Sequence, residues 1–183
     1  MKKKDLKDIF SKYVPREMAE KLATGKKLPE SSGGNRIQQR AVVAITLADP
    51  SGFFLSSQLH NEISTLLKDL TGEWIIESLA PLPFLSAPAD KLVKTEFDSL
   101  LHRLASGDWK FRAICAIGSV DFGNVGSQSF MSFGSTGPLV SWVGEGAIVL
   151  PRPLSWGNKA VADLLQRPIQ NPIEVSHHEY YRL

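Results

Sequence analysis

Apolar positions along this chain form two patterns, continuous runs of strand length and residues repeated at helical spacing. Continuous runs occur at 41–48, 74–79 and 111–117. They predict strands, and the first reads as a central strand buried on both faces. Helical spacing at 57–70 and 90–104 predicts two amphipathic helices. The glycine-rich residues 118–137 favour a hairpin, and late strands are expected at 148–150 and 173–181.

The segments outside these runs set the boundaries. Residues 1–25 have helical spacing, with Pro15 suited to open a second short helix, whereas 26–40 are polar and read as a loop. Prolines make 80–83 a poor sheet segment, since each removes a backbone donor. The element order predicts an α/β fold, an α+β sandwich with a ferredoxin-like βαββαβ core behind N-terminal helices. We divide the chain into a helical segment 1–25, a loop 26–40 and a domain 41–183.

Composition narrows the class of protein. The chain has 183 residues, 43% of them hydrophobic, and a formal net charge of +2, which suits one globular domain and no nucleic-acid partner. Its single cysteine, Cys115, excludes an internal disulfide and reads as a small buried hydrophobe. No apolar stretch reaches the roughly 18 residues of a membrane span, and no apolar signal core follows the first lysines. We therefore expect a cytoplasmic protein.

Four stretches carry a family resemblance in their order and spacing. They are FSKYVPREMAEKLATG at 10–25, LADPSGFF at 47–54, GNVGS at 123–127 and EYYRL at 179–183. Together they make the chain resemble the class III adenylate/guanylate (nucleotidyl) cyclase catalytic domain. The resemblance implies attack of a ribose hydroxyl on the α-phosphate of a nucleoside triphosphate, a reaction that depends on positioning and charge neutralisation. It also implies two metal ions held by two aspartates, and a site completed across a dimer.

On this resemblance, the metal-binding half of the site is incomplete. The first metal aspartate corresponds to Asp49, which could equally be a turn residue before Pro50. The second corresponds to Leu79, which cannot ligate a metal. Glu77 lies two residues earlier, on the same face of an extended strand, and is the possible substitute. The adenine-selecting lysine has no counterpart in this strand.

The half of the site contributed by the partner subunit is also altered, on an ungapped count from GNVGS. The adenine-selecting aspartate corresponds to Ser132, and the ribose-orienting asparagine corresponds to Ser141. Both serines remain candidate nucleotide-binding residues. The transition-state arginine corresponds to Glu145, which reverses the charge that the reaction needs. Gly144 and Gly146 also weaken the helix expected here, by roughly 1 kcal/mol each against alanine.

The resemblance and its departures together predict a degenerate cyclase homology domain, an inactive module that dimerises and acts in regulation or ligand sensing in signalling. No resident cofactor is expected, with Mg²⁺ or Mn²⁺ only if some nucleotide binding remains. The expected partner is a second copy or a related cyclase-like domain, with a nucleotide as a possible ligand. The alternative is a working adenylate/guanylate cyclase in which Asp49 and Glu77 hold metal and Arg152 or Lys159 replaces the lost cation. Neighbouring His177 and His178 are not expected to share a metal, since adjacent strand residues face opposite sides.

Overall fold

One sheet organises the molecule, and three of its first four strands were predicted, although β1 begins at Arg36, inside the stretch expected to be a loop. The structure is a computed structural model and describes residues 23–24, 36–49, 56–67, 73–78, 83–107, 110–127 and 130–183. The elements of the first half are β1 (Arg36–Leu47), α3 (Ser56–Leu67), β2 (Ile75–Ser78), β3 (Phe84–Pro88), a 3₁₀ turn (Ala89–Lys91), α4 (Lys94–Ser106) and β4 (Phe111–Ser127). Those of the second half are β5 (Phe130–Thr136), α5 (Pro138–Val149), β6 (Trp156–Gly157), α6 (Lys159–Leu165), β7 (Ile173–Val175) and β8 (His178–Arg182).

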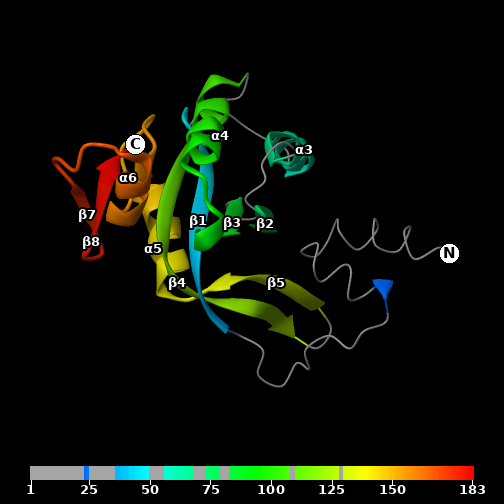
Figure 1. Ribbon diagram of the computed structural model, residues 1–183. Helices are drawn as coiled ribbons and strands as arrows, with labels where there is room; N and C mark the ends of the chain where they lie inside the picture. Colours follow the sequence, from blue (N-terminus) through cyan, green and yellow to red (C-terminus); the bar gives the residue numbers. More distant parts are fainter. Residues whose placement is uncertain are drawn as a thin grey trace.

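The strand order confirms the ferredoxin-like core. Strands lie in the order β2-β3-β1-β4-β6-β8-β7, and β5 pairs with β4. β1 runs antiparallel to both β3 and β4, whereas β6 runs parallel to β4. Figure 1 shows that β4 continues past the other strands and pairs with β5 as a long hairpin. The first four strands with α3 and α4 therefore form the βαββαβ unit, and the later elements extend it.

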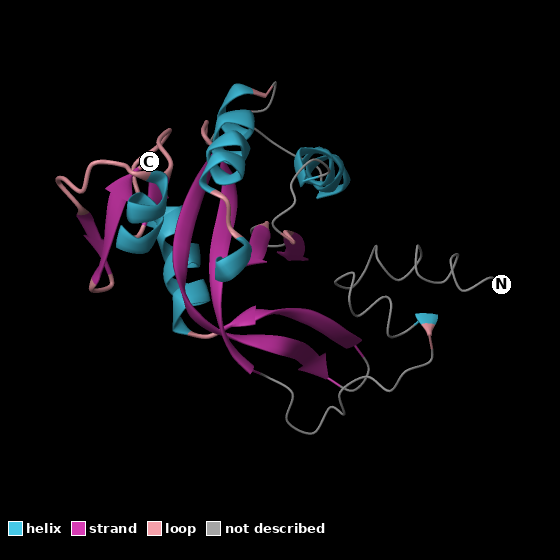
Figure 2. Ribbon diagram, in the orientation of Figure 1, coloured by secondary structure: helices cyan, strands magenta, loops and turns pink. Residues whose placement is uncertain are grey.

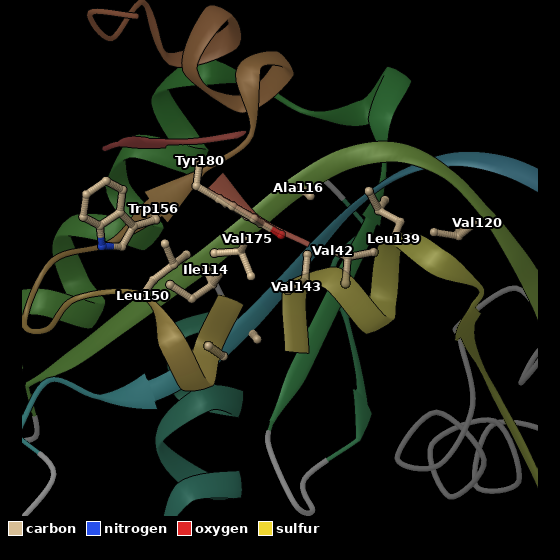
Figure 3. Close-up of a cluster of buried hydrophobic side chains, with 12 residues drawn as sticks. Val42, Ile114, Ala116, Val120, Leu139, Val143, Leu150, Trp156, Val175 and Tyr180 are labelled. Carbon is tan, nitrogen blue, oxygen red and sulfur yellow. The ribbon is translucent and has the colours of Figure 1, made fainter. Parts of the chain in front are cut away.

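Helices cover both faces of the sheet, which explains the continuous apolar run of β1. Val42 and Ala44 face α5, whereas Val43 and Ile45 face α3, α4 and α6. Figure 2 shows α5 and α4 on opposite sides of the long strands. The core on the α5 side, shown in Figure 3, comprises Val42, Ala44, Ile114, Ala116, Val120, Leu139, Val143, Ala147, Leu150, Trp156, Val175 and Tyr180. A strand buried on both faces has no polar side to alternate with.

The structure corrects several predicted elements. The predicted strand at 148–150 is wrong, because Ile148 and Val149 are the last residues of α5 and Leu150 follows it. A three-residue apolar run cannot distinguish a strand from the end of an apolar helix. The sequence also missed β3, although Pro83 and Pro88 lie just before it and at its end, where they leave its interior unbroken. β6 and α6 were missed as well, and most of the predicted N-terminal helical segment lies outside the described residues.

Helix α5 forms over twelve residues despite its two glycines. It begins after Gly137, whose φ of +108° favours glycine, and Pro138 occupies its first turn. A Cβ on Gly146 would lie 3.1 Å from Leu150, 3.2 Å from Ile114 and 3.4 Å from Tyr180. Gly146 therefore allows α5 to approach the sheet closely. The close packing offsets the low helix propensity of glycine.

We expect alanine at the two helical glycines of α5 to have opposite outcomes. A Cβ on Gly144 would meet only Phe84, at an ordinary 3.5 Å, so Gly144→Ala should stabilise the domain by up to about 1 kcal/mol through helix propensity. Gly146→Ala should be less stable than Gly144→Ala by about 1–3 kcal/mol, because its methyl group overpacks the core. Urea unfolding of both variants measures the difference. Equal stabilities would contradict the role assigned to Gly146.

Candidate functional site

Asp49 lies in a bend two residues after the end of β1, and it is exposed. Two backbone contacts position this bend. The amide of Ala48 donates to the carbonyl of Lys110 at 2.8 Å, and Arg152 Nη1 donates to the carbonyl of Leu47 at 3.1 Å. Arg152, one of the two cations considered as substitutes, is therefore bound two residues from Asp49. Lys159, the other, pairs with Asp163 on α6 at 2.7 Å.

Glu77, on β2, has both carboxylate oxygens bound by protein donors. Its Oε1 accepts a hydrogen bond from Ser86 Oγ on β3 and another from Ser135 Oγ on β5 at 2.6 Å. Its Oε2 accepts from the backbone amide of Ser135 at 2.7 Å. The carboxylate thus joins β2 to β3 and to β5.

The structure does not bring Asp49 and Glu77 together. Ala44 of β1 pairs with Phe84, which pairs with Ser78 beside Glu77. Leu47 lies three residues beyond Ala44, about 10 Å along the strand, and Asp49 follows it. The Glu77 side chain reaches the other way, to Ser86 opposite Val42. By this register Asp49 and the Glu77 carboxylate lie at different levels along the strands, which disfavours their sharing a two-metal site whose ions are roughly 3.5–4 Å apart.

No group of three or more histidine, cysteine, aspartate or glutamate side chains that could hold a metal ion occurs among the described residues. The metal-binding roles of Asp49 and Glu77 therefore stay predictions from the resemblance. Within the same described residues, no helix combines the length and the apolar character that crossing a membrane would require.

The three residues that the resemblance predicts for the half of the site completed by a partner, Ser132, Ser141 and Glu145, lie on β5 and α5. Ser132 pairs with Val125 of β4, and its side chain lies outside what the structure describes. Ser141 and Glu145 are both exposed on α5, four residues apart and therefore on one face of the helix. Glu145 Oε2 accepts a hydrogen bond from Ser176 Oγ at 2.7 Å. The position predicted to correspond to the cyclase arginine therefore carries a carboxylate that a serine holds.

The turn between β7 and β8 packs on α5 through a second contact. His178 lies against Trp142, with ring centroids 3.3 Å apart. Ser176 and His177 form this two-residue turn with φ of +50° and +66°, an arrangement that usually requires asparagine or glycine. His177 lies 3.3 Å from Glu174. The two histidines face different partners, but His177 lies in the turn rather than on a strand, so the alternation expected of strand residues is not the reason.

Sequence reasoning missed the contacts among five polar and aromatic side chains. We call this set the five-strand ring, and its members are Arg40, Glu77, Ser86, Phe122 and Ser135. Arg40 on β1 is 4% exposed and donates to Ser86 Oγ from Nε at 3.0 Å and from Nη2 at 2.8 Å. Its guanidinium lies 3.9 Å from the ring centroid of Phe122 on β4. Phe122 pairs directly with Ser135, which binds Glu77. Burial lowers the pKa of Arg40, and the charges of Glu77 and Glu73 oppose that shift.

Arg112, a second buried arginine, was also missed, although an arginine inside an apolar strand is a visible signal. It is 0% exposed, and its four hydrogen bonds go to Thr46 Oγ1 and the carbonyls of Ala147, Leu150 and Pro151, at 2.8–3.0 Å. Burial lowers its pKa, with a further contribution from Arg152. A guanidinium this buried must have hydrogen-bond partners, and it finds them at the carboxyl end of α5.

Comparison with known proteins identifies the fold. No family profile matches this sequence, and no curated protein matches it either. A bacterial light-regulated adenylyl cyclase aligns with a TM-score of 0.65 and 14% identity, over 96% of this chain and 60% of that one. The adenylyl cyclase CyaB from P. aeruginosa aligns at 0.61 and 12% identity, over 82% and 95%. The guanylate cyclase domain of RhGC from Catenaria anguillulae, in complex with GTP, aligns at 0.59 and 11% identity, over 80% and 96%.

The chain therefore has the fold of the class III adenylyl and guanylyl cyclase domains. The alignment covers 60% of the light-regulated cyclase chain, 95% of the CyaB chain and 96% of the RhGC domain. At these identities the match establishes the fold alone.

Proposed function

We propose that this domain is a degenerate nucleotidyl cyclase homology domain that does not form a cyclic nucleotide and acts as a dimerising regulatory or ligand-sensing module. The observation that carries the proposal is Glu145. It stands where the family has its transition-state arginine, on the exposed face of α5, and Ser176 holds its carboxylate. An arginine acting on a transferring phosphate raises the rate by roughly 10³–10⁵-fold, because it neutralises negative charge. A carboxylate at the same position repels that negative charge.

The metal half supports the same proposal. The position of the second metal aspartate is leucine in this sequence, and the nearby Glu77 is fully engaged by Ser86 and Ser135. Asp49 lies away from Glu77, beyond the end of β1. A metal would have to displace three hydrogen bonds to recruit Glu77, and would still lack Asp49 as a neighbour.

The base-binding half supports it as well. In the family that the chain resembles, side chains on the strands corresponding to β2 and β5 select the base. Here Glu77 on β2 binds the hydroxyl and the amide of Ser135 on β5, so these two strands are tied to each other. A base that entered between them would have to break those bonds.

Dimerisation is supported by the surface of α5. Ile148 is 74% exposed and Val149 is 57% exposed on this helix, whose other face is in the core. Two neighbouring apolar side chains this exposed at the end of a helix suit a covering surface, so a second copy or a related cyclase-like domain is the proposed partner.

We expect no cyclic nucleotide above the no-enzyme blank from ATP, GTP, CTP or UTP, with either Mg²⁺ or Mn²⁺, at any protein concentration that produces dimer. A mass measurement in the same buffer reports the dimer. Turnover that Asp49→Ala abolishes would overturn the proposal, since Asp49 is the one position that the resemblance assigns to a metal and that keeps an aspartate. Asp163→Ala, which removes an exposed aspartate on α6, is the matched control.

A second candidate is a working cyclase with a rearranged site, favoured by one contact. Arg152 binds the carbonyl of Leu47, so a cation stands beside the bend that carries Asp49. This candidate requires that Arg152→Met and Asp49→Ala each remove the turnover. A non-catalytic sensor is distinguished by titration calorimetry, which would show heat on adding a nucleoside triphosphate or cyclic nucleotide without product formation.

A further inference from the structure

The five-strand ring takes one residue from each of the strands β1 to β5. Arg40 is on β1, Glu77 on β2, Ser86 on β3, Phe122 on β4 and Ser135 on β5. Figure 1 shows the β4–β5 hairpin running on past the rest of the sheet, on the side where β2 and β3 lie. The ring therefore sits where the hairpin leaves the sheet, and it joins the two.

The ring contacts both strands of the β4–β5 hairpin at the same position along its length. Phe122 and Ser135 are direct partners in the β4–β5 ladder. Phe122 is covered by the guanidinium of Arg40, and Ser135 is bound through both its hydroxyl and its amide to Glu77. Ser86 Oγ closes the ring, because it accepts from Arg40 and donates to Glu77. A movement of the hairpin at this level must break contacts on both of its strands.

Burial makes these contacts costly to break. Arg40, Ser86 and Ser135 are 4%, 0% and 8% exposed, so each would lose a partner without gaining full hydration if the hairpin moved slightly. The positive charge of Arg40 and the negative charge of Glu77 meet on the same hydroxyl group. The ring is thus a charge-balanced unit whose members depend on each other.

We infer that Glu77 is a positioning residue that locks the β4–β5 hairpin against β2 and β3, and thereby sets where α5 begins. β5 ends at Thr136, and Gly137 alone separates it from the first residue of α5. The orientation of the hairpin is therefore passed directly to the helix that carries Ser141 and Glu145. This inference holds whether or not the domain is a cyclase, since it rests on the ring alone.

Hydrogen–deuterium exchange of Glu77→Gln tests the inference. The glutamine side chain of this variant retains one acceptor oxygen but presents an NH₂ group to the donors of Ser86 and Ser135. The substitution also removes the negative charge that balances Arg40. We expect the amides of 121–136 to exchange about 10- to 100-fold faster, the effect of losing a charged hydrogen bond. The amides of 42–45, in the centre of β1, should keep their wild-type protection.

Two further variants complete the test. Glu145→Gln changes a carboxylate that binds one exposed serine, Ser176, and should leave exchange in the hairpin unchanged. Ser135→Ala removes the hydroxyl donor but keeps the hydrogen bond from its backbone amide to Glu77. It should therefore accelerate exchange of the same hairpin amides by a smaller factor. If Glu77→Gln does not fold, the result for Ser135→Ala tests the inference. Two results would overturn the inference. One is a hairpin that exchanges at the wild-type rate in Ser135→Ala and in any Glu77→Gln protein that folds. The other is faster exchange spread equally over β1 and the hairpin.

Discussion

Replacing Arg112 with methionine is expected to lower the free energy of unfolding by at least about 3 kcal/mol, because hydrogen bonds to a charged group contribute roughly 1.5–3 kcal/mol each. Arg112 makes four of them from a fully buried position. Methionine fills part of the volume but leaves the carbonyls of Ala147 and Leu150 without this donor. Pro151 keeps a second donor, Trp156 Nε1 at 3.0 Å.

The conservative variant Arg112→Lys should also be strongly destabilised. One ammonium group cannot reproduce the planar fork that reaches Thr46 on β1 and the last turn of α5 together. Arg152→Met is the matched control, because Arg152 is exposed and donates to a single carbonyl, that of Leu47. Its effect should stay within about 0.5 kcal/mol. Urea unfolding that found Arg112→Met as stable as Arg152→Met would show that the buried guanidinium contributes nothing to holding α5.

The second large effect is expected at alkaline pH, from Tyr180. This side chain is 1% exposed and lies in the core between α5 and the sheet (Figure 3). Burial raises the pKa of Tyr180 to about 12 from its ordinary value of 10.0, with smaller contributions from Cys115 and Glu145. The unfolded chain therefore releases the phenol proton first, so stability is fully present below pH 10 and is lost as the pH rises toward 12.

We expect this loss to reach about 3 kcal/mol by pH 12, at roughly 1.4 kcal/mol for each unit of pKa difference. Tyr180→Phe cannot ionise, so its stability should fall less steeply above pH 10. The measurement is urea unfolding of both proteins between pH 8 and 11.5. Burial raises the pKa of the Cys115 thiol too, but Cys115 is present in both proteins and its contribution cancels in the comparison. Parallel pH profiles would contradict the assignment.

The fold was largely predictable because its signals are local. The run at 41–48 and that at 111–117 have no polar face, and a strand without a polar face must be covered on both sides. Cys115, as expected, is buried. β3 was missed because the prolines of 80–83 discouraged a strand there, and only the pairing with β1 shows that a strand begins directly after them, at Phe84. The strand expected at 148–150 failed because α5 is apolar on more than its core face.

The candidate site was predictable only as separate positions. Counting from GNVGS placed Ser141 and Glu145 on one helix, and the structure has them exposed on α5. Nothing along the chain indicated that Ser176, 31 positions later, would bind Glu145. Likewise Glu77 was a candidate metal ligand only because it lies two residues before Leu79, on the same face of a strand, and nothing near it in sequence indicated that Ser86 and Ser135 would bind it.

By itself the sequence determined the main strands, two of the helices and the burial of the central strands, and it predicted which residues correspond to the positions of a cyclase site. Local spacing carries that information, since helices and strands repeat over a few residues. Only the tertiary structure decided what the charged groups do. Arg40 and Glu77 are 37 positions apart and meet on Ser86, and Arg112 finds its partners on α5. A buried charge is stabilised by whichever donors and acceptors the fold brings to it, and those come from strands and helices that lie far apart along the chain.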